Sequence, residues 1–467
     1  MTGPGAFDLT VIGSGPGGYA AALTAARRGL RVGLIEREQW GGVCLNVGCI
    51  PTKALVAVAH LVRRIQRAGQ MGVVVQSYAV DYPAVMARTE RVVATLRRGL
   101  TELLRREGVE LVQGSASFDG PTQLAVIHEG VTQRLESRWI VIATGGRPMA
   151  GPWTFDEARL LSYRGLLSLR TLPRSLLIIG GGVIGCEFAS CLAAFGTQVT
   201  IVEQQPQLLP MEDAEAVRWL TRRFEADGMT VLTGKTVERL ESSSTGVLAT
   251  LTDGTQHSAE RCLIAIGQHP NLESLQLSAA GVAFGRGVTV DASLRTNRPQ
   301  IAAIGDCLDA HGLAHWASAE GTLAVRNLLG DPPQTLEAHE VPRCIFTDPE
   351  IAHIGVLASE AGESVRASRM SFGALGKSQC DEETEGFIKL LVDSATDRVR
   401  GATIVGANAS ALIHYAVLAI QHGLTAKQLA RTITAHPTLP EAITETAAHL
   451  YGESLVVAAP RRNRTAV

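Results

Sequence analysis

The sequence has no strong excess of either charge. Its 467 residues include 43 Lys and Arg against 45 Asp and Glu, which gives a net charge of −2, and charged residues make up 19% of the chain. Domains that bind DNA or RNA usually carry a basic patch, so this balance argues against a nucleic-acid partner. The length is sufficient for about two to four domains with a sizeable core.

Targeting and membrane-spanning patterns are also missing. The first residues, MTGPGAFDLTVIG, contain no basic region ahead of an apolar stretch, so we expect no secretory signal. Residues 9–26 lack charge, but the glycines and proline in their middle fit a glycine-rich turn better than a membrane span. We therefore expect a cytoplasmic protein without a membrane contact. In that compartment a functional cysteine pair is catalytic more often than structural.

Most of the eight cysteines lack a spacing typical of metal ligands, so we predict no metal site. Cys186 and Cys191 are five residues apart, but they lie in an uninterrupted helical pattern, GCEFASCLAAFG. Such residues are about 140° apart around a helix and about 7.5 Å apart along it. That separation exceeds the reach of a disulfide, so we interpret this pair as helix packing. Four cysteines are scattered along the chain, namely Cys262, Cys307, Cys344 and Cys380.

The remaining two cysteines lie in the stretch 41–55, GGVCLNVGCIPTKAL. Pro51 fits the first position of a helix, so Cys49 is expected near a helix N-terminus, where free backbone N–H groups favour a thiolate. Gly48 allows backbone conformations that could bring Cys44 and Cys49 together. This pattern favours a redox-active disulfide. Spacing alone leaves open that both are small buried core residues.

A first dinucleotide-binding βαβ unit is predicted near the N-terminus. Residues 9–12 form a short apolar strand, residues 19–29 have a helical pattern, and residues 30–35 form a second strand that leads to Glu36. The acid is expected to bond a ribose hydroxyl, and the glycines allow close approach to a pyrophosphate. The G-x-G-x-x-G spacing of the turn is supplied by Gly13, Gly15 and Gly18.

A second unit of the same kind follows a linker rich in Pro and Gly. Residues 176–179 form its first strand, and residues 198–202 form a strand that leads to Glu203. An acid at this position can bond the 2′-hydroxyl of NAD but would repel the phosphate of NADP. No basic pair lies there, so we expect NAD. The glycines of this turn are Gly180, Gly182 and Gly185.

These motifs resemble the class I pyridine nucleotide-disulfide oxidoreductases, and within that family they are most similar to the dihydrolipoamide dehydrogenases. The resemblance covers about fifteen consecutive positions around the cysteine pair, and the other motifs follow in the family's order. It implies that the first unit binds FAD and the second binds NAD. It also implies that Cys49 is the sulfur beside the flavin, that Cys44 is the interchange thiol, and that Lys53 lies against the flavin.

The family pattern places further residues in the sites. Glu187 would pair with Lys53 beneath the flavin, although the sequence alone also fits an ordinary helix-surface carboxylate. Asp306, at the end of TNRPQIAAIGD, would accept a hydrogen bond from the ribityl chain. The other implied FAD contacts are Ser115, Ala116, Thr144, Gly145 and Ala314, and the other implied NAD contacts are Val237 and Gly267.

The segment TAHPTLPEA carries His436 and Glu441. A single histidine in a long chain is usually structural, but the family resemblance implies that His436 is the acid–base residue and that Glu441 orients its ring. In the family this pair serves the cysteines of the other subunit, which implies a homodimer. Pro440 departs from the family pattern, where a small polar residue is usual.

We therefore expect an α/β protein with two Rossmann-like dinucleotide-binding domains and a C-terminal α+β dimerisation domain. The FAD domain would be discontinuous, with the NAD domain inserted in it. The expected boundaries are 1–147 and 271–340 for the two FAD sections, 148–270 for the NAD domain and 341–467 for the dimerisation domain.

The expected activity is oxidation of dihydrolipoamide, free or as a lipoyl protein, with FAD and NAD as cofactors. A reductase of another disulfide or of a metal ion could share every motif. A subunit that acts mainly by docking to components of a 2-oxoacid dehydrogenase or glycine-cleavage assembly is a further alternative. The basic tail PRRNRTAV has no cysteine pair, which disfavours mercuric reductases, and Glu203 disfavours the glutathione reductases, which use NADP.

Overall fold

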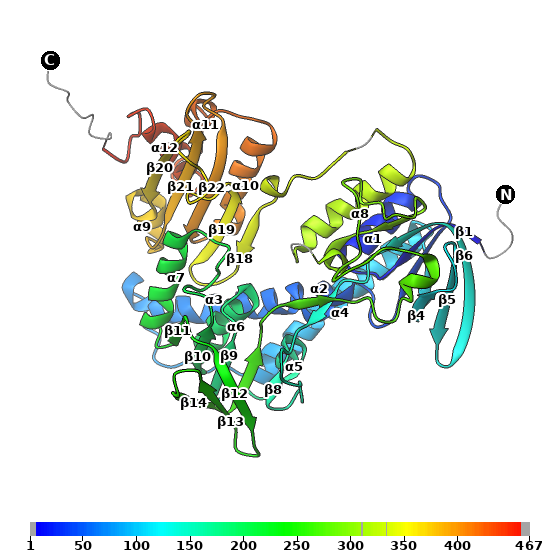
Figure 1. Ribbon diagram of the computed structural model, residues 1–467. Helices are drawn as coiled ribbons and strands as arrows, with labels where there is room; N and C mark the ends of the chain where they lie inside the picture. Colours follow the sequence, from blue (N-terminus) through cyan, green and yellow to red (C-terminus); the bar gives the residue numbers. More distant parts are fainter. Residues whose placement is uncertain (1–5, 310–311, 333, 459–467) are drawn as a thin grey trace.

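The computed structural model describes residues 6–309, 312–332 and 334–458. It is an α/β protein, as expected, in which three sheet-based regions surround two long helices (Figure 1). The basic tail PRRNRTAV lies outside the described residues.

The first sheet contains the predicted FAD unit. Strands β1, β2, β3 and the C-terminal half of β6 run parallel, whereas β5 pairs antiparallel with the N-terminal half of β6 and β4 pairs with β5. The last strand comes from far along the chain, because β17 (Ile301–Ala303) pairs with β6. The strands are β1 (Ala6–Ile12), β2 (Val32–Glu36), β3 (Glu110–Gln113), β4 (Ser115–Phe118), β5 (Gln123–His128) and β6 (Val131–Ile142).

Two helices cover this sheet side by side, α1 (Pro16–Ala26) and α8 (Ala314–Leu328) (Figure 1). They approach closely because both present glycine at the contact. A Cβ on Gly321 would lie 2.3 Å from the carbonyl oxygen of Gly17, so a larger residue would push the helices apart. This packing places the N-terminus of α8 beside the glycine turn that precedes α1.

The second sheet is parallel and contains the predicted NAD unit, in the order β11-β10-β9-β15-β8. A separate antiparallel sheet, β12-β13-β14, extends from it. The parallel strands are β8 (Leu160–Leu161), β9 (Ser175–Ile179), β10 (Gln198–Glu203), β11 (Thr230–Thr233) and β15 (Arg261–Ile264). The others are β12 (Val237–Ser242), β13 (Val247–Leu251) and β14 (Gln256–Ala259), and the helices are α5 (Tyr163–Ser168), α6 (Val183–Ala194) and α7 (Ala214–Ala226).

The chain enters and leaves this second region at one place. Strand β7 (Gly146–Pro148) pairs antiparallel with β16 (Gln268–Pro270), and β17 then returns to the first sheet. The second unit is therefore inserted between two sections of the first. The paired strands lie close to the expected boundaries at residues 147 and 270, which remain predictions.

The C-terminal region is an antiparallel sheet in the order β18-β19-β22-β21-β20. Its strands are β18 (Arg343–Ile345), β19 (Glu350–Gly355), β20 (Val365–Ser371), β21 (Phe387–Asp393) and β22 (Val399–Gly406). Its helices are α9 (Gly376–Asp381), α10 (Ala409–Gln421), α11 (Ala426–Ala430) and α12 (Glu441–His449).

Helices α3 (Cys49–Arg67) and α4 (Tyr82–Arg106) run between the three regions (Figure 1). Helix α3 begins two residues before Pro51, so Cys49 is its first residue and Gly48 is its N-cap. It follows the short helix α2 (Gly42–Val47), which carries Cys44.

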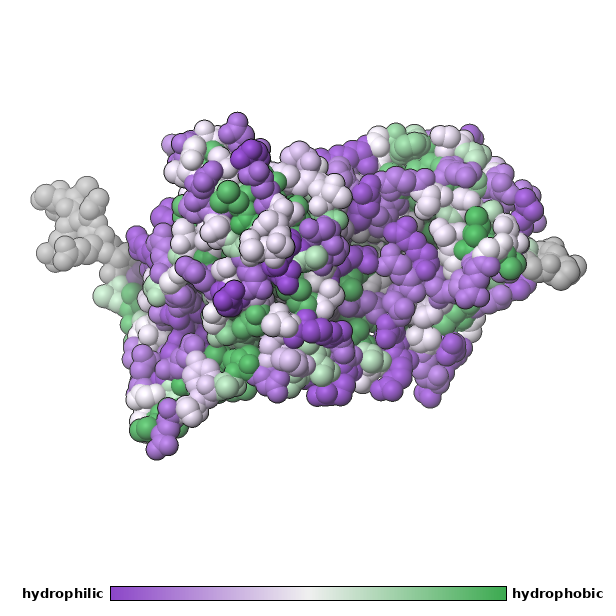
Figure 2. Space-filling model, turned by 90° about the horizontal axis from the view of Figure 1, so that it is seen from below, coloured by the Kyte–Doolittle hydropathy of each residue, from purple (hydrophilic) through white to green (hydrophobic). Residues whose placement is uncertain are grey.

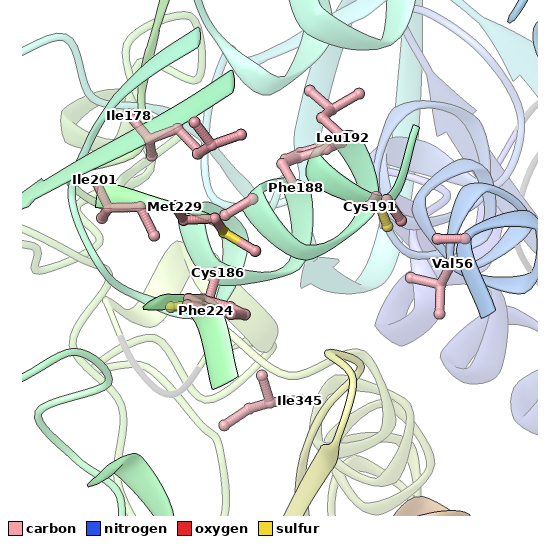
Figure 3. Packing of buried hydrophobic residues seen from close by; sticks show 14 of the residues in the cluster. Val56, Ile178, Cys186, Phe188, Cys191, Leu192, Ile201, Phe224, Met229 and Ile345 are labelled. Atoms are coloured by element: carbon pink, nitrogen blue, oxygen red, sulfur yellow. The ribbon is translucent and has the colours of Figure 1, made fainter. Parts of the chain in front are cut away.

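One hydrophobic cluster joins α3 to the second region and includes Cys186 and Cys191 of α6, which are 0% and 1% exposed. Figure 3 shows the two cysteines in different parts of this cluster, Cys191 toward Val56 of α3 and Cys186 toward Phe224 of α7. Their predicted packing role is confirmed. Because the cluster fixes α3 against α6, it sets the position of Cys49, at the start of α3, relative to the second dinucleotide unit.

One helical stretch, Gly42–Met71, is long and apolar enough to cross a membrane, with a mean hydropathy of 1.6. It is interrupted at Gly48, and it supplies Val56 and Ala59 to the core, as internal helices of globular proteins do. On the face seen from below, hydrophobic and hydrophilic residues are interspersed (Figure 2). The expected absence of a membrane contact stays a prediction.

Candidate active site

A single cavity of about 1970 Å³ joins both glycine turns and the cysteine pair. Most residues that the sequence singles out line it. From the first unit and its extensions these are Gly13, Gly15, Glu36, Cys44, Cys49, Lys53, Ser115, Ala116, Thr144, Gly145, Asp306 and Ala314. From the second unit they are Gly180, Gly182, Glu187, Glu203, Val237 and Gly267. Four residues are not part of its lining, namely Gly18, Gly185, His436 and Glu441.

The two cysteines meet at the junction of α2 and α3. Their sulfur atoms are 2.6 Å apart, and both thiols are free in this structure. The backbone therefore already holds the pair in position for a disulfide, without further movement of the chain. Gly48 permits this approach, because a Cβ at that position would lie 3.0 Å from the carbonyl oxygen of Val43.

The surroundings of the two thiols give them different acidities. The hydrogen bond from Cys44 and the nearby Lys53 ammonium lower the pKa of the Cys49 thiol, although burial opposes them. The same hydrogen bond, together with burial, raises the pKa of Cys44. Cys49 is thus the more acidic of the two thiols, and its position at the start of α3 favours the thiolate form further.

Lys53 and Glu187 form an ion pair across the boundary between the two dinucleotide units. The Lys53 ammonium lies 2.8 and 3.0 Å from the two carboxylate oxygens of Glu187, whose side chain is 5% exposed. Removing one partner of a fully buried pair costs about 3–5 kcal/mol, and less here because the side chain of Lys53 is 34% exposed.

Phe346, near the start of the C-terminal region, contacts both members of this ion pair. The backbone N–H of Phe346 donates to Glu187 at 3.1 Å, and the Lys53 ammonium lies 4.4 Å from the centre of the Phe346 ring. The ion pair thus ties α3, α6 and the residue that follows β18. Sequence reasoning missed Phe346, because nothing in VPRCIFTDPEIAHIG indicates that its backbone reaches a carboxylate distant in the chain.

The turn that carries Cys44 is fixed by Asn46, another residue that sequence reasoning missed. Its side-chain amide donates to the backbone carbonyls of Gln39, Trp40 and Gly42 at 3.3, 3.0 and 2.8 Å. Arg97 of α4 donates to the amide oxygen of Asn46 at 3.3 Å. The position of Asn46 between the two cysteines was the one available signal.

The first glycine turn has the form that a dinucleotide needs. A Cβ on Gly18 would lie 1.8 Å from the carbonyl oxygen of Gly13, so this glycine allows α1 to pack on the turn. Gly15 has open space where a Cβ would project, and it faces the cavity. Glu36 ends β2 and accepts hydrogen bonds from the backbone N–H and hydroxyl of Ser14 at 3.1 and 2.6 Å.

The second glycine turn repeats this arrangement. A Cβ on Gly185 would lie 2.1 Å from the carbonyl oxygen of Gly180, whereas Gly182 has open space in front of it. Glu203 ends β10 and accepts hydrogen bonds from the backbone N–H groups of Gly181 and Gln205 at 2.6 and 2.7 Å. It is 7% exposed and borders the cavity.

Asp306 lies in the turn between β17 and α8, where burial raises the pKa of its carboxyl group. The turn is fixed by Glu320 of α8, which accepts a hydrogen bond from the backbone N–H of Gly305 at 2.6 Å and another from Trp316. Glu320 is 4% exposed, and sequence reasoning did not single it out. Its place in ASAEG, one helix turn after Trp316, was the available signal.

The predicted acid–base pair lies on the C-terminal region. His436 Nδ1 is 2.8 Å from a carboxylate oxygen of Glu441, and the backbone N–H of Thr438 donates to the other oxygen at 2.6 Å. Burial raises the pKa of Glu441, but these two hydrogen bonds outweigh it and the net pKa is lowered. The His436 side chain is 77% exposed and does not line the cavity of its own chain, so its predicted acid–base role stays a prediction.

Comparison with known proteins identifies the family. Residues 7–321 match the profile of the pyridine nucleotide-disulphide oxidoreductases, and residues 341–447 match the dimerisation domain of the same family. A dihydrolipoyl dehydrogenase from Chlamydia pneumoniae is 39% identical over 440 residues, covering 93% of this chain and 95% of that protein. One from Bacillus subtilis is 36% identical over 447 residues, covering 94% and 97%.

Two solved structures have the same overall fold. LpdA from Mycobacterium tuberculosis superposes with a TM-score of 0.90 at 31% identity, covering 95% of this chain and 99% of that chain. The Cu(II) complex of the HOCl-induced flavoprotein disulfide reductase RclA from Escherichia coli gives a TM-score of 0.86 at 27% identity, with the same coverage.

Proteins of this family use FAD and NAD, and the residues present here fit both groups. Each glycine turn leaves open space at its middle glycine, and each is followed by a strand that ends in a glutamate. The dimerisation domain supports a homodimer. From the profile matches and from relatives that are 36–39% identical over most of its length, the chain belongs to the pyridine nucleotide-disulphide oxidoreductase family.

Proposed function

We propose that this protein is an FAD-dependent dihydrolipoyl dehydrogenase that oxidises dihydrolipoamide to lipoamide and reduces NAD. The observation that best supports this function is the Cys44–Cys49 pair. Its sulfur atoms are 2.6 Å apart, in a cavity shared by both dinucleotide turns. The similarity to curated dihydrolipoyl dehydrogenases supports the substrate.

In the proposed reaction the substrate dithiol exchanges with the Cys44–Cys49 disulfide. Two substrate S–H bonds and the enzyme S–S bond are replaced by a substrate S–S bond and two enzyme thiols. Cys44 forms the mixed disulfide, and Cys49 is held as a thiolate by its hydrogen bond and by Lys53. Bound FAD supplies the relay of two electrons to NAD.

His436 of the second subunit takes the proton of the attacking thiol, and Glu441 holds its ring in place through Nδ1. Its 77% exposure within one chain fits a group that is completed by a partner. The proposed assembly is therefore a homodimer with two such sites.

The test is the initial rate of NAD reduction by dihydrolipoamide, compared with other thiols such as the monothiol glutathione at matched thiol concentration. We expect dihydrolipoamide to be the fastest substrate, and NADP to be much poorer than NAD because the buried Glu203 carboxylate would face its extra phosphate. A negligible rate by holoenzyme would refute the substrate assignment.

One comparison favours the alternative function, a reductase of another disulfide or of a metal ion. The RclA structure that resembles this chain is described as a Cu(II) complex of a flavoprotein disulfide reductase. The two functions are separated by comparing the rate of NADH oxidation with Cu(II) as acceptor and the rate with lipoamide as acceptor. Faster turnover with Cu(II) would favour the alternative.

The larger assembly and the location are further proposals. The substrate would be a lipoyl group on a component of a 2-oxoacid dehydrogenase or glycine-cleavage assembly, in the cytoplasm. Pull-down with the purified dimer, followed by detection of lipoylated proteins, tests this. A subunit that acts mainly by docking would bind such components but oxidise dihydrolipoamide poorly.

A further inference from the structure

Tyr163 is a buried polar residue for which the motifs give no role. It is the first residue of α5, between β8 and β9 of the second dinucleotide unit. It is 6% exposed, it borders the large cavity, and its hydroxyl group makes no hydrogen bond of normal geometry with the described residues. Leaving a buried hydroxyl unpaired is costly, so a group bound in the cavity is the expected partner.

The neighbours of Tyr163 attach α5 to the other dinucleotide unit. Arg164 donates to a carboxylate oxygen of Glu38 at 2.8 Å. Glu38 lies two residues after Glu36, and its backbone N–H donates to the Glu36 carboxylate at 2.8 Å. Arg164 and Glu38 both border the same cavity as Tyr163. A segment of the NAD unit thus reaches the wall of the FAD site.

The charges of Glu38 and Asp306 both act on the Tyr163 hydroxyl, and all three residues line the same cavity. Glu38 bonds to Glu36, the predicted partner of the adenosine ribose. Asp306 is the predicted partner of the ribityl chain. In FAD the diphosphate joins these two sugar-like parts.

Tyr163 has the properties of a phosphate ligand. Burial raises the pKa of its hydroxyl group, so at neutral pH it is protonated and can donate a hydrogen bond. The adjacent Arg164 supplies a cation. Hydrogen bonds to charged oxygens are stronger than neutral ones, which suits an anion enclosed in a cavity.

We propose that Tyr163 and Arg164 bind the diphosphate of FAD from the NAD-binding side of the cavity. FAD is then held by both dinucleotide units, and its release requires α5 to give up these contacts. The proposal does not depend on which disulfide the enzyme reduces.

The test is the rate at which FAD leaves the holoenzyme, followed by the rise in flavin fluorescence after dilution. Tyr163→Phe keeps the ring and removes only the hydroxyl, and we expect release to become about tenfold faster. Tyr82→Phe is the matched control. Tyr82 is 4% exposed, packs edge-on against Phe195 with ring centres 6.4 Å apart, and does not border the cavity.

A second pair of variants tests the cation. Arg164→Met is expected to release FAD faster than wild type, whereas Arg170→Met is expected to be unchanged, because Arg170 pairs with Glu90 outside the cavity. Far-UV circular dichroism confirms that each variant is folded. Unchanged release in Tyr163→Phe or in Arg164→Met overturns the proposal, and so does equal acceleration in Tyr82→Phe. Because no dithiol is used, the result is independent of the proposed dehydrogenase activity.

Discussion

At the scale of single residues, the chemistry rests on how charge is divided between two thiols. Cys49 lies at the start of α3, where the Lys53 ammonium acts on it, while Cys44 lies in the preceding helix α2 and donates a hydrogen bond to the Cys49 sulfur. The different acidities fit the proposed division of roles, in which the more acidic thiol stays beside the cofactor and the other exchanges with substrate.

Lys53→Met is expected to raise the pKa of Cys49 in the reduced enzyme. The ammonium lowers that pKa, and once it is lost the Glu187 carboxylate, which raises it, acts without its counter-ion. Less thiolate is then present near neutral pH, so alkylation of Cys49 by iodoacetamide at pH 7 should slow about threefold or more. Mass spectrometry of the Cys49 peptide gives the rate across pH. Lys235→Met is the control, since Lys235 pairs with Asp253 in the second unit. A midpoint that moves to lower pH would contradict this expectation.

His436→Gln is expected to lower turnover by at least about 100-fold, because glutamine cannot take the thiol proton. FAD should stay bound, since His436 does not border the cofactor cavity of its own chain. Steady-state kinetics and the flavin absorbance of the purified variant check both parts. His422→Gln, a change at the C-cap of α10, provides a histidine control. Full activity in His436→Gln would remove this residue from the mechanism.

At the scale of elements, a single carboxylate anchors the segment that carries the proposed acid–base pair, His436 and Glu441. Asp397, in the turn between β21 and β22, accepts hydrogen bonds from the Tyr451 hydroxyl at 2.7 Å, from Arg366 at 2.8 Å and from the backbone N–H of Lys427 at 3.1 Å. Lys427 is in α11, and Tyr451 follows α12. Both ends of the segment that contains His436 are therefore fixed to one turn.

Tyr451→Phe tests this anchor. Without the hydroxyl the end of α12 loses its hydrogen bond to Asp397, and we expect turnover to fall about three- to tenfold, with FAD content and dimer mass unchanged. The pH profile of turnover should also broaden or shift, because the His436–Glu441 geometry becomes less uniform. Tyr78→Phe is the control. Tyr78 lies in the segment between α3 and α4, and its hydroxyl group bonds to Gln66 of α3. Turnover and a pH profile that match wild type would show that α12 holds its place without this contact.

Features set by neighbouring residues could be predicted from the sequence, whereas contacts between distant segments could not. The glycine spacings and the strand-end glutamates are local, so both units, with Glu36 and Glu203, were predictable. The contacts of Asn46 with Arg97, of Phe346 with Glu187 and of Arg164 with Glu38 join chain segments that are far apart in sequence. No spacing rule records such contacts, and only the folded chain brings them together.

Even within the cysteine motif the local prediction was incomplete. Proline at the first helical turn suggested that the helix begins at Pro51, but α3 begins at Cys49. Proline is tolerated throughout the first turn, where backbone N–H groups have no partner in the helix. Pro51 therefore indicated that a helix begins nearby, but α3 begins at Cys49, directly after its N-cap Gly48.

At the scale of the whole molecule, the cysteine pair and the acid–base pair belong to different surfaces of one chain. The cysteines border the internal cavity, whereas His436 faces outward from the C-terminal region, whose sequence matches the family's dimerisation domain. A complete site therefore requires a second subunit in the proposed mechanism.

Mixed dimers test this sharing. Cys44→Ser and His436→Gln subunits are each expected to be inactive alone, but a dimer of one with the other contains one intact site. Random reassortment after mild denaturation should then restore about a quarter of wild-type activity, because half of the dimers are mixed and each has one of two sites. Mixing either variant with itself is the control. No recovery, with exchange verified by native mass spectrometry of tagged subunits, would mean that the pair acts within its own chain.

The central claim is that electrons pass from dihydrolipoamide to NAD through Cys44 and Cys49. The most direct measurement is the initial rate of NAD reduction by dihydrolipoamide in Cys44→Ser holoenzyme, compared with wild type and with Cys380→Ser, whose cysteine is exposed and outside the cavity. We expect Cys44→Ser to lose all detectable turnover while retaining FAD, and Cys380→Ser to keep the wild-type rate. Undiminished turnover in Cys44→Ser would contradict the central claim.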